Sequence, residues 1–211
     1  MATIGERLAQ GGIIIMDGGV STEIQKQGVA MDTQVWSAIA HVEHPDIARQ
    51  VHESYIRAGA EVITANTFAT ARHVLDNKGM ADDFEMVNRR AVEVAREARD
   101  NTADCEVLIA GSISSTMAFD QGYRSAEGDV ALQNYGDQAA IFAEAGADLI
   151  VLEMMLDREG AIPCTEAAVA SGLPVWVGFS ASMRAGQVIG YNEIERSDMP
   201  IIDFADLVDA I

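Results

Sequence analysis

Two acidic side chains, Asp17 and Glu153, come directly after short apolar runs and are the residues of this sequence best suited to chemistry. A carboxylate at the rim of an apolar core is costly to bury, so it usually has a ligand or a hydrogen-bond partner. Asp17 is followed by Gly18 and Gly19, whose backbone N–H groups can approach a ligand closely. This grouping could hold an amino acid, with Asp17 as the counter-charge for the ammonium group and the glycine amides bound to the carboxylate.

The same residues have structural roles as alternatives. Asp17 could cap a helix in a tight turn, and Glu153 could pair with an asparagine or a backbone N–H group. Asn66 and Ser180 follow two further apolar runs and complete the candidate substrate-binding set. For each of these two, fixing a loop is the more economical role.

Residue types that bind metals are few and scattered. His41 and His44 are three residues apart, but neither lies just before the acidic cluster that a zinc hydrolase needs, so we expect no histidine metal site. Cys105 and Cys164 are the only two cysteines and are not in a CxxC spacing. They predict neither a disulfide framework nor a zinc knuckle, and we interpret them as buried structural thiols.

Five apolar runs have to position the candidate residues. They are 13–16, 61–65, 107–111, 149–152 and 175–179, and the residues that follow them are Asp17, Asn66, Ser112, Glu153 and Ser180. Each run leads through a loop into a helix-like stretch, and this alternation predicts a parallel sheet with right-handed crossovers. The C-terminal ends of the strands are where a (β/α)₈ barrel has its active site.

Helical periodicity and end signals separate the runs. The predicted helices run from Pro45 to just before Gly59, along an apolar stripe from Phe84 to Ala98, along a second stripe from Tyr135 to Gly146, and over 158–171. The polar segment 113–129 is predicted to lie over the mouth of the barrel.

A last apolar stripe, formed by Phe204, Leu207, Val208 and Ile211, has helical spacing and no stop signal after it, which predicts that the chain ends inside a helix. Five βα units cannot close an eight-stranded barrel, and free sheet edges expose unpaired backbone groups. We therefore expect residues 1–211 to form a single domain, an incomplete (β/α)₈ TIM barrel truncated before strands six to eight. Further sequence or a complementing chain would complete it, and a homo-oligomer is an alternative assembly.

The composition excludes several classes of partner. With 14 Lys and Arg against 33 Asp and Glu, the net charge is −19, so the surface would repel a nucleic acid backbone. No run approaches the roughly 20 apolar residues of a membrane span, and the first ten residues lack the apolar core of a signal peptide. We expect a cytoplasmic protein that binds neither nucleic acid nor membrane.

Seven stretches occur in the order of one known family: 16–19 with 22–23, 35–38, 52–63, 65–68, 110–113, 145–148 with 152–153, and 172–180. They read MDGG with TE, VWSA, HESYIRAGAEVI, ANTF, AGSI, AGAD with LE, and GLPVWVGFS. On these residues the chain resembles the homocysteine S-methyltransferase family. The same homocysteine-binding barrel occurs in betaine–homocysteine methyltransferases and in the N-terminal module of cobalamin-dependent methionine synthase.

The resemblance implies a zinc-dependent transfer of a methyl group from an onium or folate donor to homocysteine, giving methionine. In such enzymes three cysteine thiolates hold Zn²⁺, which binds the homocysteine sulfur and lowers its pKa. Carried over residue by residue, Asp17 and Glu153 would bind the amino group of homocysteine, and the amides of Gly18 and Gly19 its carboxylate.

The family's zinc ligands, a Cys after an Asn near the end of strand six and a Gly-Gly-Cys-Cys after strand eight, have no counterpart in this chain. We therefore expect it to carry the amino-acid-binding part, with no metal ligand and no catalytic residue of its own. The segment after Ile113 also lacks the Gly-Pro that many members carry. Two alternatives stay open: a non-catalytic subunit that completes its barrel with another chain, and an unrelated barrel enzyme that uses Asp17 and Glu153 as acid and base.

Overall fold

The computed structural model describes residues 3–33, 35–115, 128–155, 158–184 and 186–190. The helices are α1 (Ile4–Ala9), α2 (Val20–Lys26), α3 (Ala40–Glu43), α4 (Pro45–Arg57), α5 (Arg72–Asn77), the 3₁₀ turn η1 (Ala81–Asp83), α6 (Phe84–Thr102), α7 (Gly128–Ala145) and α8 (Arg158–Ala170). The strands are β1 (Val62–Thr64), β2 (Leu108–Ile113), β3 (Leu149–Met155), β4 (Val175–Phe179), β5 (Ala181–Arg184) and β6 (Gln187–Gly190).

The centre of the fold is a parallel sheet in the order β1-β2-β3-β4, so that strands consecutive in the sequence are neighbours in space. Four of the five apolar runs form these strands, which confirms the predicted parallel α/β sheet. In a doubly wound sheet the strand order reverses at a switch point, and no reversal occurs among the strands described here. The sequential order is the one found in a (β/α)₈ barrel, whose closure stays a prediction.

The first apolar run lies beside β1 but forms no full strand. Met16 makes a single parallel bridge with Val62, and the Ile15 carbonyl accepts hydrogen bonds from the Glu61 and Val62 N–H groups. Side chains occupy some of its other backbone groups, because Arg7 donates to the Ile13 carbonyl and Glu61 accepts from the Ile15 N–H. The predicted position is therefore right, although the hydrogen-bonded ladder is too short for a strand.

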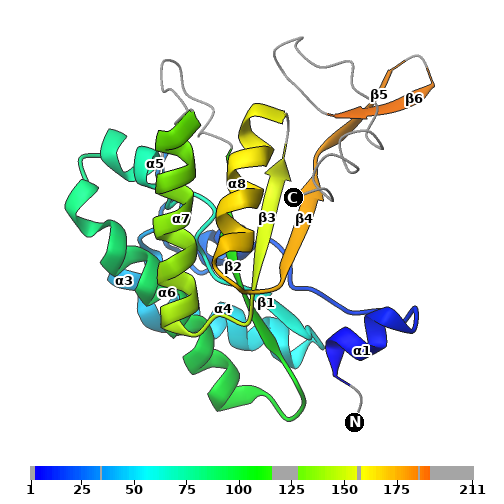
Figure 1. Cartoon of the computed structure of the whole chain (residues 1–211). Helices are drawn as coiled ribbons and strands as arrows, with labels where there is room; N and C mark the ends of the chain where they lie inside the picture. The colour runs from blue at the N-terminus through cyan, green and yellow to red at the C-terminus, as the bar shows by residue number, and fades with distance from the viewer. Residues whose placement is uncertain (1–2, 34, 116–127, 156–157, 185, 191–211) are drawn as a thin grey trace.

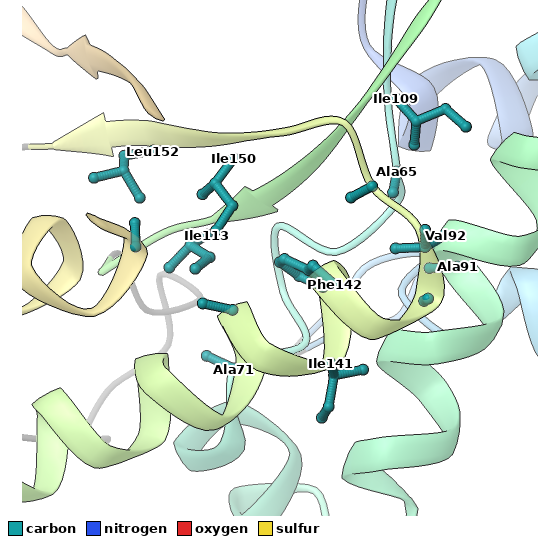
Figure 2. Packing of buried hydrophobic residues seen from close by; sticks show 14 of the residues in the cluster. Ala65, Ala71, Ala91, Val92, Ile109, Ile113, Ile141, Phe142, Ile150 and Leu152 are labelled. Carbon is teal, nitrogen blue, oxygen red and sulfur yellow. The ribbon is translucent and has the colours of Figure 1, made fainter. Parts of the chain in front are cut away.

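The main helices cover one face of this sheet (Figure 1). Helices α4, α6, α7 and α8 pack side by side in that order, as the predicted crossovers require. Side chains from β2 and β3, among them Ile113 and Ile150, lie over the buried ring of Phe142 on α7 (Figure 2). A Cβ on Gly111 of β2 would overlap the Phe142 ring, so this glycine is what lets α7 approach the sheet.

The opposite face of the sheet is covered at one end by α1. Ile4 is buried against Val62, Ala110, Leu149 and Val151. Burial of a side chain of this size stabilises the fold by about 1.5–3 kcal/mol. The main helices therefore cover one face of the sheet, and the short helix α1 covers part of the other face. The carboxyl ends of the strands remain available for a site.

All four predicted helices are confirmed, as α4, α6, α7 and α8. The shorter helices and the antiparallel β5–β6 hairpin, which extends from the end of β4 in Figure 1, were not predicted. Most of the segment 113–129 and the stripe from Phe204 to Ile211 lie outside the described residues. Among the helices described, none has both the length and the apolar character needed to cross a membrane.

Candidate functional site

The carboxylate of Asp17 is bound to the end of strand β1. Its Oδ2 accepts a hydrogen bond from the Thr64 backbone N–H at 2.7 Å, and its Oδ1 accepts one from the Thr64 hydroxyl at 2.9 Å. Helix α2 begins at Val20, with Gly19 as an N-cap that offers no side chain. The alternative in which Asp17 caps a helix is therefore wrong, and its carboxylate lies at the carboxyl edge of the sheet.

Glu153 lies in β3 where the regular ladder with β4 breaks. The register shifts between Leu152 and Met155, and Met154 has a φ of 56°. Such bulges and backbone outliers are common beside active sites. Glu153 Oε2 accepts a hydrogen bond from the Ser112 hydroxyl on β2. The prediction that the strand ends at residue 152 is three residues short, because β3 continues through the irregularity to Met155.

The environment of both carboxyl groups disfavours their charged forms. Burial raises the pKa of the Asp17 carboxyl to about 7, the charge of Glu153 adds to the rise, and the hydrogen bonds from Thr64 oppose it. Burial also raises the pKa of Glu153, against the hydrogen bond from Ser112. Neither carboxylate forms an ion pair within the described ranges. A cation placed between them would favour the ionised form of both.

Asn66 is buried and joins three segments near this edge. Its Nδ2 donates to the Ser37 carbonyl at 2.7 Å, and its Oδ1 accepts from the Ser21 hydroxyl at 3.3 Å. The Ser37 hydroxyl in turn donates to the Ser21 oxygen at 2.7 Å. These bonds agree with the loop-fixing role expected for Asn66, and direct contact with a substrate stays a prediction.

The remaining candidates are backbone or half-exposed groups. Gly18 and Gly19 are exposed, and their N–H groups have no acceptor among the residues that the structure describes. The Ser180 N–H donates to the Met155 carbonyl at 3.0 Å, which places Ser180 beside the end of β3. Substrate contact by these three residues stays a prediction, and their placement at the strand ends is compatible with it.

Two threonines of this edge were not predicted to belong to the site. Thr64 holds Asp17, and the Thr67 hydroxyl donates to the Ser112 carbonyl at 2.8 Å while accepting from the Ser112 N–H at 3.0 Å. The available signal was their position on either side of Asn66. Threonine is also an ordinary strand residue, so its type alone indicated no site role.

A stacked aromatic pair, Trp36 and Phe68, lies on two loops joined by the Asn66–Ser37 hydrogen bond. Their ring centroids are 5.2 Å apart with an interplanar angle of 16°, and Trp36 has a φ of 51°. A φ in this region is a strained conformation for a bulky residue. The pair is partly exposed and lies beside the Asn66–Ser37 hydrogen bond.

A zinc site is not found among the described residues, where no group of three or more His, Cys, Asp or Glu side chains could hold a metal ion. Cys164 is buried in α8, as expected, but Cys105 is exposed. The prediction of burial is wrong for Cys105 because it lies in the connection between α6 and β2. The residues present therefore do not fit the three-thiolate zinc site that the resemblance implies.

Comparison with known proteins decides the family. A model of the family described as homocysteine S-methyltransferase matches residues 14–201. The chain belongs to the homocysteine S-methyltransferase family. The resemblance noted from the seven stretches is thus confirmed, and the strand-end carboxylates Asp17 and Glu153 lie within the matched region.

Relatives in this family include betaine–homocysteine S-methyltransferase 1 of Mus musculus and of Bos taurus, each 32% identical over 175 residues. The match covers 81% of this chain and 41% of theirs, so the chain spans about two fifths of their length. Homocysteine S-methyltransferase 1 of Arabidopsis thaliana is 25% identical over 197 residues, covering 81% of this chain and 59% of that protein.

The fold is similar to that of a solved family member. The metallated homocysteine methyltransferase MmuM from Escherichia coli superposes with a TM-score of 0.75 at 23% identity, over 96% of this chain and 73% of that one. At this identity the likeness concerns the fold. It supports the parallel α/β architecture described above.

Proposed function

We propose that this chain forms the amino-acid-binding part of a homocysteine S-methyltransferase. The observation that carries the proposal is the pair of half-buried carboxylates, Asp17 and Glu153, held by Thr64 and Ser112 and without an ion pair in the described region. An ammonium group is the cation that fits such a pair in a family that acts on homocysteine.

In the proposed complex each group of the amino acid has its own partner. Asp17 and Glu153 accept hydrogen bonds from the ammonium group, and the N–H groups of Gly18 and Gly19 donate to the carboxylate. Ser180 lines the same edge. The homocysteine thiol loses its proton to solvent, and the thiolate sulfur attacks the methyl carbon of the donor: the S–C bond forms, and the donor's leaving group departs with the electrons of the broken bond.

The activation of the thiol is a separate matter from its recognition. The resemblance implies that zinc performs it, yet the described residues offer no ligand set for the metal. We therefore expect this chain to hold no stoichiometric zinc, which metal analysis can measure. The residues of this chain account for binding and orientation of the amino acid, and the metal ligands of a complete site come from elsewhere.

The methyl donor is proposed to be a small onium compound or a folate. The aromatic faces of Trp36 and Phe68 favour an onium cation, because a cation is attracted to the face of an aromatic ring. We propose a cytoplasmic protein whose ligands are small molecules, with neither a nucleic acid nor a membrane as a partner.

Calorimetric titration of the chain with homocysteine and with mercaptobutanoic acid, which lacks the amino group, tests the proposal. Homocysteine should bind at least tenfold more tightly, since a charge-assisted hydrogen bond contributes about 1.5–3 kcal/mol. Equal affinity for both compounds would contradict the proposed role of the carboxylates.

The sequence left two alternative functions open, and an observation favours one of them. Exposed apolar side chains on the outermost run, Ile13 and Ile15, are 81% and 54% exposed and form a surface that a complementing chain or a second copy could cover. In that case the chain is a non-catalytic subunit, and light scattering should show an assembly. The second alternative, an unrelated barrel enzyme that uses Asp17 and Glu153 as acid and base, is wrong because the chain belongs to the homocysteine S-methyltransferase family.

A further inference from the structure

Tyr55 on α4 lies against Gly18, the first glycine of the turn after Asp17. A Cβ on Gly18 would lie 3.0 Å from the Tyr55 hydroxyl oxygen, 3.4 Å from its Cε1 and 3.5 Å from its Cζ. The two distances to carbon are close to ordinary van der Waals contacts, whereas the distance to oxygen is too short. A Cβ at position 18 would therefore require the Tyr55 hydroxyl or the turn to shift by a few tenths of an ångström.

The backbone itself does not require glycine at this turn. Gly18 has no φ in the left-handed region, and Gly19 has a φ of −66° and a ψ of 93°. Residues with a Cβ adopt such conformations readily. The contact with Tyr55, rather than the conformation of the chain, is what accounts for glycine at position 18.

The Tyr55 side chain is held in place from two sides. Its ring packs against the large cluster between the sheet and the helices, and also against the cluster that contains Val20, Ile24 and Val51. Burial raises the pKa of the Tyr55 phenol, and the charges of Glu23 and Asp17 add to the rise, so the hydroxyl is protonated at neutral pH. Moving the ring away from position 18 would disturb its packing against both clusters.

We propose that Tyr55 is the positioning residue of the carboxylate subsite. Its ring and hydroxyl fix the backbone at Gly18 and Gly19 so that their N–H groups face the carboxylate of the amino acid. This inference rests on the function proposed above and names the side chain that sets the geometry of one half of that site.

A double-mutant cycle tests the proposal. Gly18→Ala is made in the wild-type chain and in a Tyr55→Phe background, and calorimetry gives the dissociation constants for homocysteine and for the aminopropanethiol that lacks its carboxylate. In the wild-type chain, Gly18→Ala should weaken homocysteine binding about three- to tenfold, because a shift of a few tenths of an ångström impairs a hydrogen bond. In the Tyr55→Phe background the loss should be under about twofold, because the short contact is gone.

The affinity for the decarboxylated compound separates positioning from general structural damage. It should change by less than about twofold on Gly18→Ala in either background, since that compound makes no use of the glycine amides. Gly19→Ala is the matched control: its Cβ would lie 3.3 Å from the Thr22 hydroxyl and does not meet Tyr55. Its effect should be the same in both backgrounds.

Three results would overturn the inference: an equal loss on Gly18→Ala in both backgrounds, an equal loss for both ligands, or failure of Gly18→Ala to fold in both backgrounds by circular dichroism. Folding of Gly18→Ala in the Tyr55→Phe background alone would support it. Failure of the proposed function is distinguishable, because the wild-type chain would then bind no homocysteine before any variant is made.

Discussion

Replacing Asp17 by asparagine should make the folded protein more stable above neutral pH while weakening its binding of homocysteine. The pKa of this carboxyl is raised from 3.8 to about 7 in the folded state, mainly by burial. Its charged form is thus disfavoured on folding by up to about 4 kcal/mol. Asparagine can retain both contacts with Thr64, with its Oδ1 accepting from the N–H and its Nδ2 donating to the hydroxyl.

The sign of the pH dependence follows from the direction of the shift. Because the folded pKa lies above the unfolded one, the contribution of Asp17 to the free energy of unfolding is fully present below pH 4 and is lost as the pH rises to about 7. The asparagine side chain of the variant does not titrate, so the variant lacks this loss. At pH 8 we expect Asp17→Asn to be about 1–3 kcal/mol more stable than the wild type, and at pH 4 about equal to it.

Urea unfolding of both proteins at pH 4, 6 and 8 measures this difference. Asp148→Asn is a matched control, because Asp148 also accepts a hydrogen bond from a strand N–H, that of Ile109 at 2.8 Å, but has Arg99 as an ionic partner. Its replacement should lower the stability at pH 8 by about 0.5–1 kcal/mol. An Asp17→Asn variant with the same pH dependence as the wild type would refute the reasoning, since the carboxylate would then be well solvated.

Two further changes probe the same site, and a third probes a buried histidine of helix α4. Glu153→Gln should raise the dissociation constant for homocysteine about tenfold or more, measured by calorimetry, with mercaptobutanoic acid as the ligand that should show no such loss. Thr64→Val removes the hydroxyl that donates to Asp17, so the pKa of Asp17, followed by carboxyl carbon NMR, should rise above about 7; no change would mean that this bond does not stabilise the charge. Burial lowers the pKa of His52 to about 4, so the wild type should lose up to about 3 kcal/mol of its free energy of unfolding as the pH falls from 6.5 to 4. The His52→Gln variant should not show this loss, and an unchanged acid transition would contradict the prediction.

The strands were predictable because a parallel strand covered on both faces must be apolar along its length. Four runs became strands, and the fifth, 13–16, lies where expected with only one bridge. The β5–β6 hairpin was missed because its residues 181–190 alternate only weakly in polarity. Met183 and Val188 pair across it and are both exposed, whereas the buried Ile189 pairs with the polar Ser182, so neither face gave a clear periodic signal. The local clue was Gly186, whose φ of 83° marks the turn.

The sequence predicted which carboxylates belong to the site, but it did not predict which residues bind them. The rule that polar residues end parallel strands pointed to Asp17 and Glu153 from their positions alone. Their partners depend on strand register: β2 pairs with β3 so that Ser112 lies opposite Val151, two residues before Glu153. That offset, and the irregularity after Leu152, cannot be derived from a single sequence, because each is set by packing between strands that are distant in the chain.

The electrostatics of the carboxyl pair also explain why the site would select an ammonium group. With a pKa of about 7, Asp17 is roughly half protonated at neutral pH, and the raised pKa of Glu153 shifts that group in the same direction. A neutral ligand leaves this proton in place, whereas an ammonium group stabilises the ionised form and displaces it. Binding should therefore release a fraction of a proton near pH 7 and none well above it. Calorimetric titrations of homocysteine in buffers of different ionisation enthalpy should show this dependence, and it should vanish in Asp17→Asn if Asp17 is the group that loses the proton.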